Sequence, residues 1–158
     1  MRLPPWQFWL SLGPALTLAL LPLPPWLSAW NPDWVALVVI FWALNYPGRT
    51  GVGAAWCAGL LLDVMQGSLL GAHALAMTVV GYLTVKLYLR IRVFPLSQQA
   101  LAVAMMLGTY HFVLFWVEGI VGGPAPGLDR GLAIVLGALT WVPLQAFLKS
   151  MWPRIVKD

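Results

Sequence analysis

The sequence predicts an all-α integral membrane protein, a six-helix bundle formed by a single polytopic domain over residues 1–158. Of the 158 residues, 61% are hydrophobic and only 9% are charged, whereas about a quarter of the residues in soluble domains are charged. The apolar residues form helix-length runs separated by short breaks, and no polar run is longer than a loop. These observations exclude a water-soluble core, and the net charge of +4 is explained by topology signals rather than by nucleic-acid binding.

The first three helices are predicted over about residues 6–23, 32–46 and 50–65. The first resembles a secretory signal in length, but Pro14 and the clustered tryptophans favour a retained, bent helix. Asn31-Pro32-Asp33 is typical of a helix start, with Asn31 as the N-cap. The second and third runs form either two short spans or one re-entrant hairpin. A hairpin would strand Arg49 in mid-membrane at a cost of at least ~2.5 kcal/mol, so two short spans are favoured.

The last three helices are predicted over about residues 71–89, 97–118 and 128–148. Glycines and prolines at 122–127 can form only a turn or an irregular loop, which separates the last two helices. Pro143 is expected to bend the final helix, because a membrane helix tolerates proline where neighbours satisfy the freed carbonyl.

The basic residues predict the orientation of the bundle. Six spans place both termini on one side of the membrane. That side carries eight of the nine basic residues, namely Arg2, Arg49, Lys86, Arg90, Arg92, Lys149, Arg154 and Lys157. Arg130 alone falls on the other side. By the positive-inside rule, both termini are therefore cytoplasmic.

A stripe of small residues runs along the third predicted helix. Its members recur every four residues: Gly51, Ala55, Gly59, Asp63 and Gly67. Such a stripe lets another backbone approach closely. A second small-faced pattern follows in the next helix: Gly71, Ala74, Thr78 and Gly81. We therefore expect these two helices to pack tightly, with Asp63 near the turn that joins them.

The carboxylate of Asp63 has two interpretations. It either fixes its helix against the next helix or a partner through hydrogen bonds, or handles a ligand or proton. The structural interpretation is favoured, because the small-residue face directs Asp63 towards a neighbouring helix. Gly59 and Gly67 would then admit that neighbour's backbone. On this interpretation, an Asp63→Asn variant should retain most of the protein's function, whereas an Asp63→Leu variant should not.

Asp63, His111 and Glu118 are the candidate ligand-binding or proton-handling residues, because ionisable groups within membrane spans are functional candidates. An enzyme interpretation needs a motif such as HExxH or GxSxG, and neither occurs. The single cysteine, Cys57, provides neither a disulfide nor a zinc-binding pattern. We therefore expect no catalytic residue, no metal and no cofactor.

A basic loop follows the fourth predicted helix. It contains Lys86, Arg90 and Arg92 and faces the cytoplasm in the predicted topology. We expect it to act as a topology determinant that binds anionic lipids, and docking of a cytoplasmic partner is the alternative.

A family resemblance rests on the stretch from Arg49 to Tyr82. Arg49 precedes a short Gly/Ala-rich helix, and then come Gly59-Leu60-Leu61-x-Asp63-x-x-x-Gly67-x-x-Leu70-Gly71-x-x-Ala74-Leu75 and Tyr82. This pattern resembles the signature of the bacterial rod shape-determining protein family MreD. Length, six spans and the basic loop with Gln98-Gln99 are also similar, whereas the remainder matches only in hydropathy and size.

The resemblance implies a non-enzymatic scaffold subunit of the elongasome, the assembly that directs peptidoglycan synthesis and rod cell shape. The implied location is the bacterial cytoplasmic (inner) membrane. The direct partner would be MreC, contacted through its membrane helix and juxtamembrane region, and MreB filaments and the peptidoglycan polymerase and transpeptidase would be reached indirectly. Anionic lipids are expected partners, nucleic acid is not, and a homodimer is a further candidate assembly.

The family's helical arrangement is also similar to the substrate-binding subunits of energy-coupling-factor transporters. The alternative function is therefore a membrane-embedded subunit that binds a small molecule or lipid precursor. The positions that match the family are Arg49, Gly59, Asp63, Gly67, Gly71 and Tyr82. Together with Gly51 and Ala55 of the stripe, they are the predicted packing or partner residues.

Overall fold

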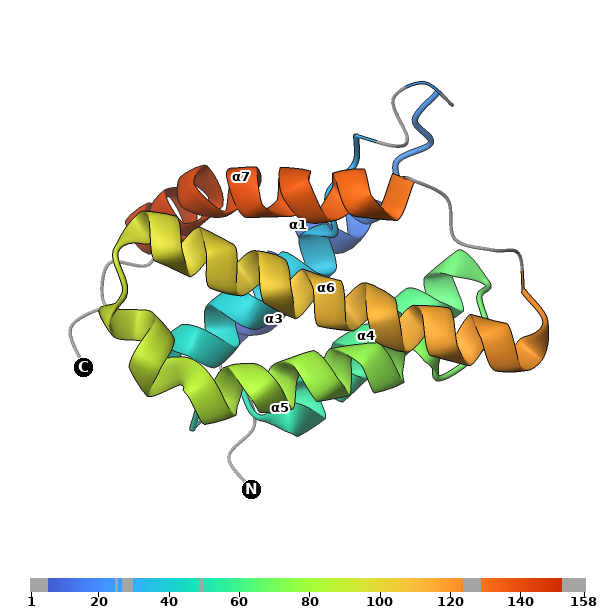
Figure 1. The fold of residues 1–158 in the computed structure, drawn as a ribbon, viewed down its shortest axis with the longest axis horizontal. Coiled ribbons are helices and arrows are strands. Elements are labelled where there is room, and N and C mark those ends of the chain that lie inside the picture. The colour runs from blue at the N-terminus through green and yellow to red at the C-terminus, as the bar shows by residue number, and fades with distance from the viewer. Residues whose placement is uncertain (1–5, 25, 27–29, 49, 124–128, 152–158) are drawn as a thin grey trace.

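The computed structural model describes residues 6–24, 26, 30–48, 50–123 and 129–151. Within these residues the chain forms six helices of twelve residues or more, and the all-helical fold is confirmed. They are α1 (Trp6–Ala19), α3 (Trp34–Asn45), α4 (Val52–Gln66), α5 (Ala72–Val93), α6 (Leu96–Val121) and α7 (Asp129–Met151). In Figure 1, α7, α6 and α5 run side by side along the long axis of the molecule, and the shorter helices lie behind them.

The helix bounds differ from the prediction by up to four residues, at the ends of α1 and α5. Helix α1 ends at Ala19 rather than at residue 23, and α3 begins at Trp34 rather than at residue 32. Asn31 is therefore not the N-cap of α3. Its side-chain oxygen instead accepts a hydrogen bond of 2.8 Å from the indole N–H of Trp34, and Asp33 stands at the N-cap without making a side-chain cap bond.

Three helices in the described part of the chain are long and apolar enough to cross a membrane. They are Ala72–Val93, Leu96–Val121 and Arg130–Met151. Helices α3 and α4 are apolar but shorter, with 12 and 15 residues. At about 1.5 Å per residue they reach only part of the way across a ~30 Å hydrocarbon layer.

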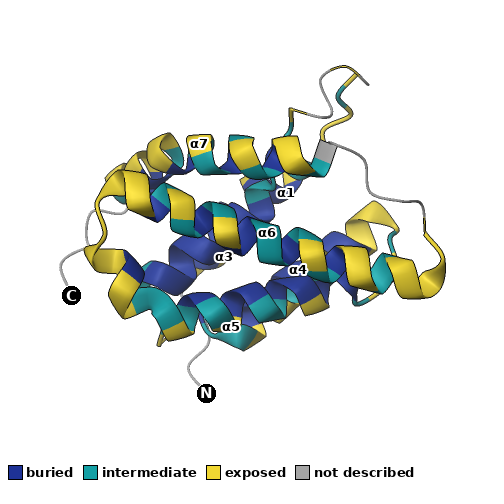
Figure 2. Cartoon of the chain, viewed as in Figure 1, coloured by how far each residue is buried: buried dark blue, intermediate teal, exposed yellow. Residues whose placement is uncertain are grey.

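Helix α3 is the centre of the bundle. Every residue from Val35 to Leu44 is buried, and α3 contacts α1, α4, α5, α6 and α7. A helix that is apolar on all faces needs other helices or lipid around it. Here other helices surround α3. Figure 2 shows the contrast with α6 and α7, whose outer faces are exposed. The short length of α3 is thus compatible with its burial.

A few polar side chains join α3 and the long helices to their neighbours. The indole N–H of Trp42 on α3 donates to the hydroxyl of Ser11 on α1 at 2.8 Å. The side-chain amide of Gln145 on α7 donates to that of Gln99 on α6 at 3.2 Å. Because each bond is buried among apolar side chains, it selects one register between two helices, since any other register would leave a polar group unpaired.

The closest helix–helix contact in this part of the fold is the packing of α4 against α5. A Cβ atom added to Gly59 would lie 2.4 Å from the Cα of Ala74 and 2.6 Å from the carbonyl oxygen of His73. A Cβ added to Gly81 would lie 2.7 Å from the Cβ of Ala55. The backbones therefore meet where the side chains are smallest, and Ala55 and Gly59 pack inside this chain.

The other glycines of the stripe do not pack in this way. No atom lies within 4 Å of a Cβ built on Gly51, Gly67 or Gly71. Gly67 and Gly71 have φ of 63° and 99°, a left-handed conformation that side chains rarely adopt. The expectation that Gly67 admits a neighbouring backbone is therefore wrong within this chain. Gly67 ends α4, and Gly71 stands at the N-cap of α5.

We predict that Gly59→Ala destabilises the protein by about 2 kcal/mol or more, because the added methyl group meets backbone atoms that cannot move aside. The matched control is Gly53→Ala in the same helix, where no atom lies within 4 Å of the new Cβ. Thermal unfolding of the detergent-solubilised protein measures both. Equal stability of the two variants would contradict the close contact between α4 and α5.

Candidate functional site

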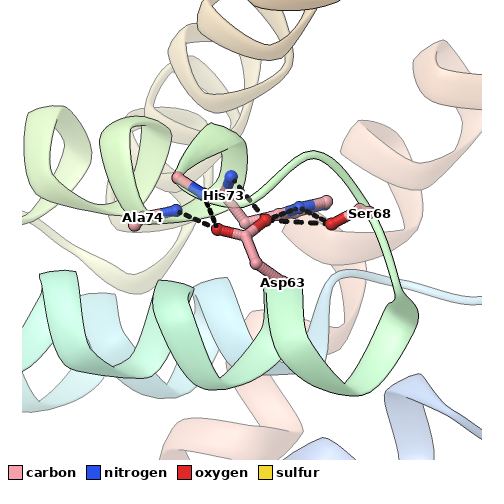
Figure 3. Close-up of polar contacts among 5 residues, drawn as sticks. Asp63, Ser68, His73 and Ala74 are labelled. Carbon is pink, nitrogen blue, oxygen red and sulfur yellow. Dashed lines mark hydrogen bonds and ion pairs between the residues drawn. The ribbon is translucent and has the colours of Figure 1, made fainter.

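The site is centred on Asp63, which lies in the last turn of α4 and is 0% exposed. Its carboxylate points across the turn towards the first residues of α5, as Figure 3 shows. The carboxylate accepts hydrogen bonds from five donors, which lie between 2.8 and 3.2 Å from its oxygens. Three of these donors are backbone N–H groups at the start of α5, from Gly71, His73 and Ala74.

The two oxygens of Asp63 divide the donors between them. Oδ1 accepts from the Ser68 hydroxyl at 2.9 Å, and from the backbone N–H and the ring Nδ1–H of His73 at 3.0 and 2.8 Å. Oδ2 accepts from the backbone N–H of Gly71 at 2.9 Å and from that of Ala74 at 3.2 Å. Asp63 therefore caps the N-terminus of α5 from the neighbouring helix. The positive end of the α5 dipole also stabilises its charge.

The turn between α4 and α5 makes this capping geometrically accessible. The N–H groups of Gly67 and Ser68 bond to the main-chain carbonyl of Asp63, which ends α4. The left-handed conformations of Gly67 and Gly71 then reverse the chain within a few residues. Asp63 consequently binds the chain on both sides of the turn, through its main chain and through its side chain.

Two further acid–base pairs lie among the described residues near this end of the bundle. His111 Nε2 on α6 lies 2.7 Å from the carboxylate of Asp33 at the start of α3. Arg130 on α7 forms an ion pair and hydrogen bond with Glu118 on α6. With Asp63 and His73, each pair joins two different helices. The structure therefore brings His111 and Glu118 to separate partners, and does not gather them around Asp63 as one ligand or proton site.

A small polar cavity of about 190 Å³ lies beside two members of these pairs, Asp33 and His73. Its wall includes Asp33, Gln66, His73 and Tyr110. The Tyr110 ring lies between the two histidines, with centroid distances of 6.1 Å to His73 and 5.2 Å to His111. Within the described residues, no group of three or more His, Cys, Asp or Glu side chains is arranged to hold a metal ion.

The remaining predicted site residues lie elsewhere. Tyr82 is exposed on α5, and the ammonium of Lys86 lies 5.9 Å from the centre of its ring. Arg90 and Arg92 lie in the last turn of α5. Arg49 falls outside the described residues.

The sequence pattern found Asp63 but missed its neighbours at the site. The sequence predicts no site role for Asp33, Ser68 or Tyr110. Asp33 is the N-cap of α3, Ser68 lies in the α4–α5 turn and Tyr110 lies on α6. One signal was available. A carboxylate in the last turn of one helix, followed by a glycine turn, will meet the N–H groups of the next helix, which attract anions.

The sequence profile of the family described as rod shape-determining protein MreD matches residues 1–151. The chain belongs to the MreD family. This membership confirms the resemblance drawn from the α4–α5 region, and the family is implicated in determining rod shape. The three long apolar helices in the described part of this chain are consistent with a membrane protein.

A curated relative supports the same assignment. The rod shape-determining protein MreD of Haemophilus influenzae (strain ATCC 51907 / DSM 11121 / KW20 / Rd) is 34% identical over 104 residues, which cover 66% of this chain. The aligned part spans 64% of the relative's own length. No solved structure matches the chain.

We predict that Asp63→Asn destabilises the protein by about 2 kcal/mol or more, in contrast to the tolerance expected from sequence. Both carboxylate oxygens accept from backbone N–H groups, so an Asn NH₂ would face donors on either side. Thermal unfolding in detergent measures the loss of stability. The control is Gln66→Ala, at an exposed position in the same turn of α4. Stability equal to the parent protein would contradict the capping role.

Proposed function

We propose that this MreD family protein is a non-enzymatic membrane scaffold of the elongasome, which binds MreC and thereby helps to direct peptidoglycan synthesis. The observation that carries the proposal is that the ionisable side chains Asp63, His111 and Glu118 are each engaged in a helix–helix contact. A protein that acts through its helix faces needs a rigid bundle, and these contacts fix the helices relative to one another. MreB filaments and the wall-synthesising enzymes would be reached through MreC.

The alternative, a transporter-like subunit that binds a small molecule, receives less support. Such a subunit needs a pocket with convergent polar groups, and pockets for small ligands are usually ~300–1,000 Å³. The polar cavity near Tyr110 is about 190 Å³. Its size suits ordered water better than a vitamin-sized ligand, so we retain the scaffold as the proposed function.

We further propose that all six helices belong to the membrane domain, with both termini in the cytoplasm of the inner membrane. The acid–base pairs would then lie at the periplasmic end and the basic residues of α5 at the cytoplasmic end, as the positive-inside rule requires. The short α3 and α4 would be accommodated by the surrounding long helices and by local thinning of the bilayer.

An apolar groove offers a docking surface for the membrane helix of MreC. It has a volume of about 360 Å³ and lies between α1, α3 and α7. Leu10, Leu18 and Phe147 line its sides, and the small residues Ser11 and Ala15 are buried in it. A groove with small side chains inside and large apolar ones at its sides fits a single transmembrane helix, because such helices associate through close van der Waals packing.

We predict that Phe147→Ala reduces recovery of co-expressed MreC in a detergent pull-down several-fold, because it removes one wall of this groove. Phe112→Ala is the matched control: both phenylalanines are 59% exposed, and Phe112 lies on α6 outside the groove. Immunoblots for membrane abundance and complementation of rod shape accompany the pull-down. Equal recovery of MreC with both variants would argue against this docking surface, and failure of the parent protein to recover MreC would overturn the scaffold proposal.

The proposed orientation predicts which positions are reached by a membrane-impermeant thiol reagent added from outside. In a Cys57→Ala background, a cysteine at residue 122 should be labelled in intact cells, and cysteines at residues 2 and 95 should be labelled only after lysis. Labelling of residue 2 or 95 in intact cells would reverse the topology.

A further inference from the structure

A second apolar groove lies between α5 and α6 at the basic end of the bundle. Its volume is about 290 Å³, and its lining is Leu83, Leu87, Arg90, Ile91 and Phe94 from α5 with Ala102, Met105, Met106 and Thr109 from α6. Ile91 and Met106 are buried and form its floor, whereas Phe94 and Met105 are exposed at its sides. Apart from the cation Arg90 and the hydroxyl residue Thr109, the lining is apolar.

The dimensions of the groove match one membrane leaflet. On α5 it extends from Leu83 to Phe94, which is about 16 Å at ~1.5 Å per residue. One leaflet of a ~30 Å hydrocarbon layer is about 15 Å thick. An acyl chain lying along this groove would therefore end near the middle of the bilayer, with its headgroup close to Arg90.

In the described part of the chain, the basic residues beside the groove form no ion pair. Among the described residues, none of Lys86, Arg90 and Arg92 forms an ion pair, and the three ion pairs of the chain involve Asp33, Asp63 and Glu118 near the other end. Arg90 and Arg92 are exposed in the last turn of α5. Exposed basic side chains therefore lie next to an apolar surface at this end of the bundle.

We propose that the α5–α6 groove is a binding site for an anionic phospholipid of the cytoplasmic leaflet, with one acyl chain between the helices and the phosphate on the Arg90 guanidinium. The guanidinium can donate two parallel hydrogen bonds to phosphate oxygens. Arg92 and Lys86 add attraction for the net negative charge. Charge complementarity favours this occupant over a partner's apolar helix, which would leave Arg90 without an anion.

The site rests on the membrane location of the bundle but not on MreC, so it is tested on the purified chain alone. The full chain in a nonionic detergent is titrated with phosphatidylglycerol or with phosphatidylcholine of the same acyl chains, and bound lipid is counted by native mass spectrometry. We expect one phosphatidylglycerol to be retained at least about tenfold more tightly than phosphatidylcholine. Both lipids carry the phosphate that Arg90 would bind, but the choline cation of phosphatidylcholine is repelled by the neighbouring basic residues.

Two pairs of variants distinguish lipid binding in the groove from general electrostatic attraction to the basic end of the bundle. Arg90→Gln should weaken phosphatidylglycerol binding about tenfold, whereas Lys86→Gln, which removes the same charge outside the groove, should weaken it much less. Ala102→Phe should fill the groove and reduce binding of the lipid, whereas Leu101→Phe, on the exposed neighbouring position, should not.

Three outcomes would overturn the proposal. Phosphatidylcholine could bind as tightly as phosphatidylglycerol, Arg90→Gln and Lys86→Gln could weaken binding equally, or the parent protein could retain neither lipid. Unchanged binding by Ala102→Phe would place the lipid on another surface and would also count against the site. Recovery of MreC in the separate pull-down is independent of all four results.

Discussion

The fold depends on the need to satisfy a buried carboxylate where water is scarce. Asp63 is fully buried, and an isolated charge in such a place would be too costly to keep. Five hydrogen bonds and the N-terminus of α5 compensate for that cost. The same contact orders the turn, sets the register of α4 against α5 and brings His73 to the polar cavity. Gly59 is required one turn before Asp63 in α4, because the carboxylate reaches its donors only if the two backbones lie close together.

The second organising feature is the burial of α3. Its neighbours bury every residue from Val35 to Leu44, and Trp34 and Val38 also line the groove between α1, α3 and α7. Polar contacts from its ends reach α1 through Trp42 and α6 through Asp33. The long helices α5, α6 and α7 consequently present their outward faces to the surroundings. These faces contain the grooves that we assign to a membrane helix and to a lipid.

The fold class and the identity of the tight helix pair could be predicted from sequence because both depend on local periodicity. Apolar runs give the helices, and the spacing of Ala55, Gly59 and Asp63 gives the packed face. The central position of α3 could not be predicted, since its sequence resembles that of any short membrane span. The pairing of His111 with Asp33 joins residues 78 positions apart, and no periodic pattern reports such a contact. The role of Gly67 was misjudged because a glycine needed for its positive φ looks the same in sequence as one needed for close packing.

The capping of α5 by Asp63 also has a consequence for the biogenesis of the protein. When α4 leaves the ribosome, its carboxylate has no donors until α5 has been synthesised and has turned back. A lone Asp disfavours membrane insertion, although less in the last turn of a helix, where Asp63 lies, than at its centre. Insertion of α4 together with α5 removes this barrier, because the N–H groups of Gly71, His73 and Ala74 already bind the carboxylate in the hairpin. In the proposed topology, the α4–α5 hairpin would therefore enter the bilayer as one unit.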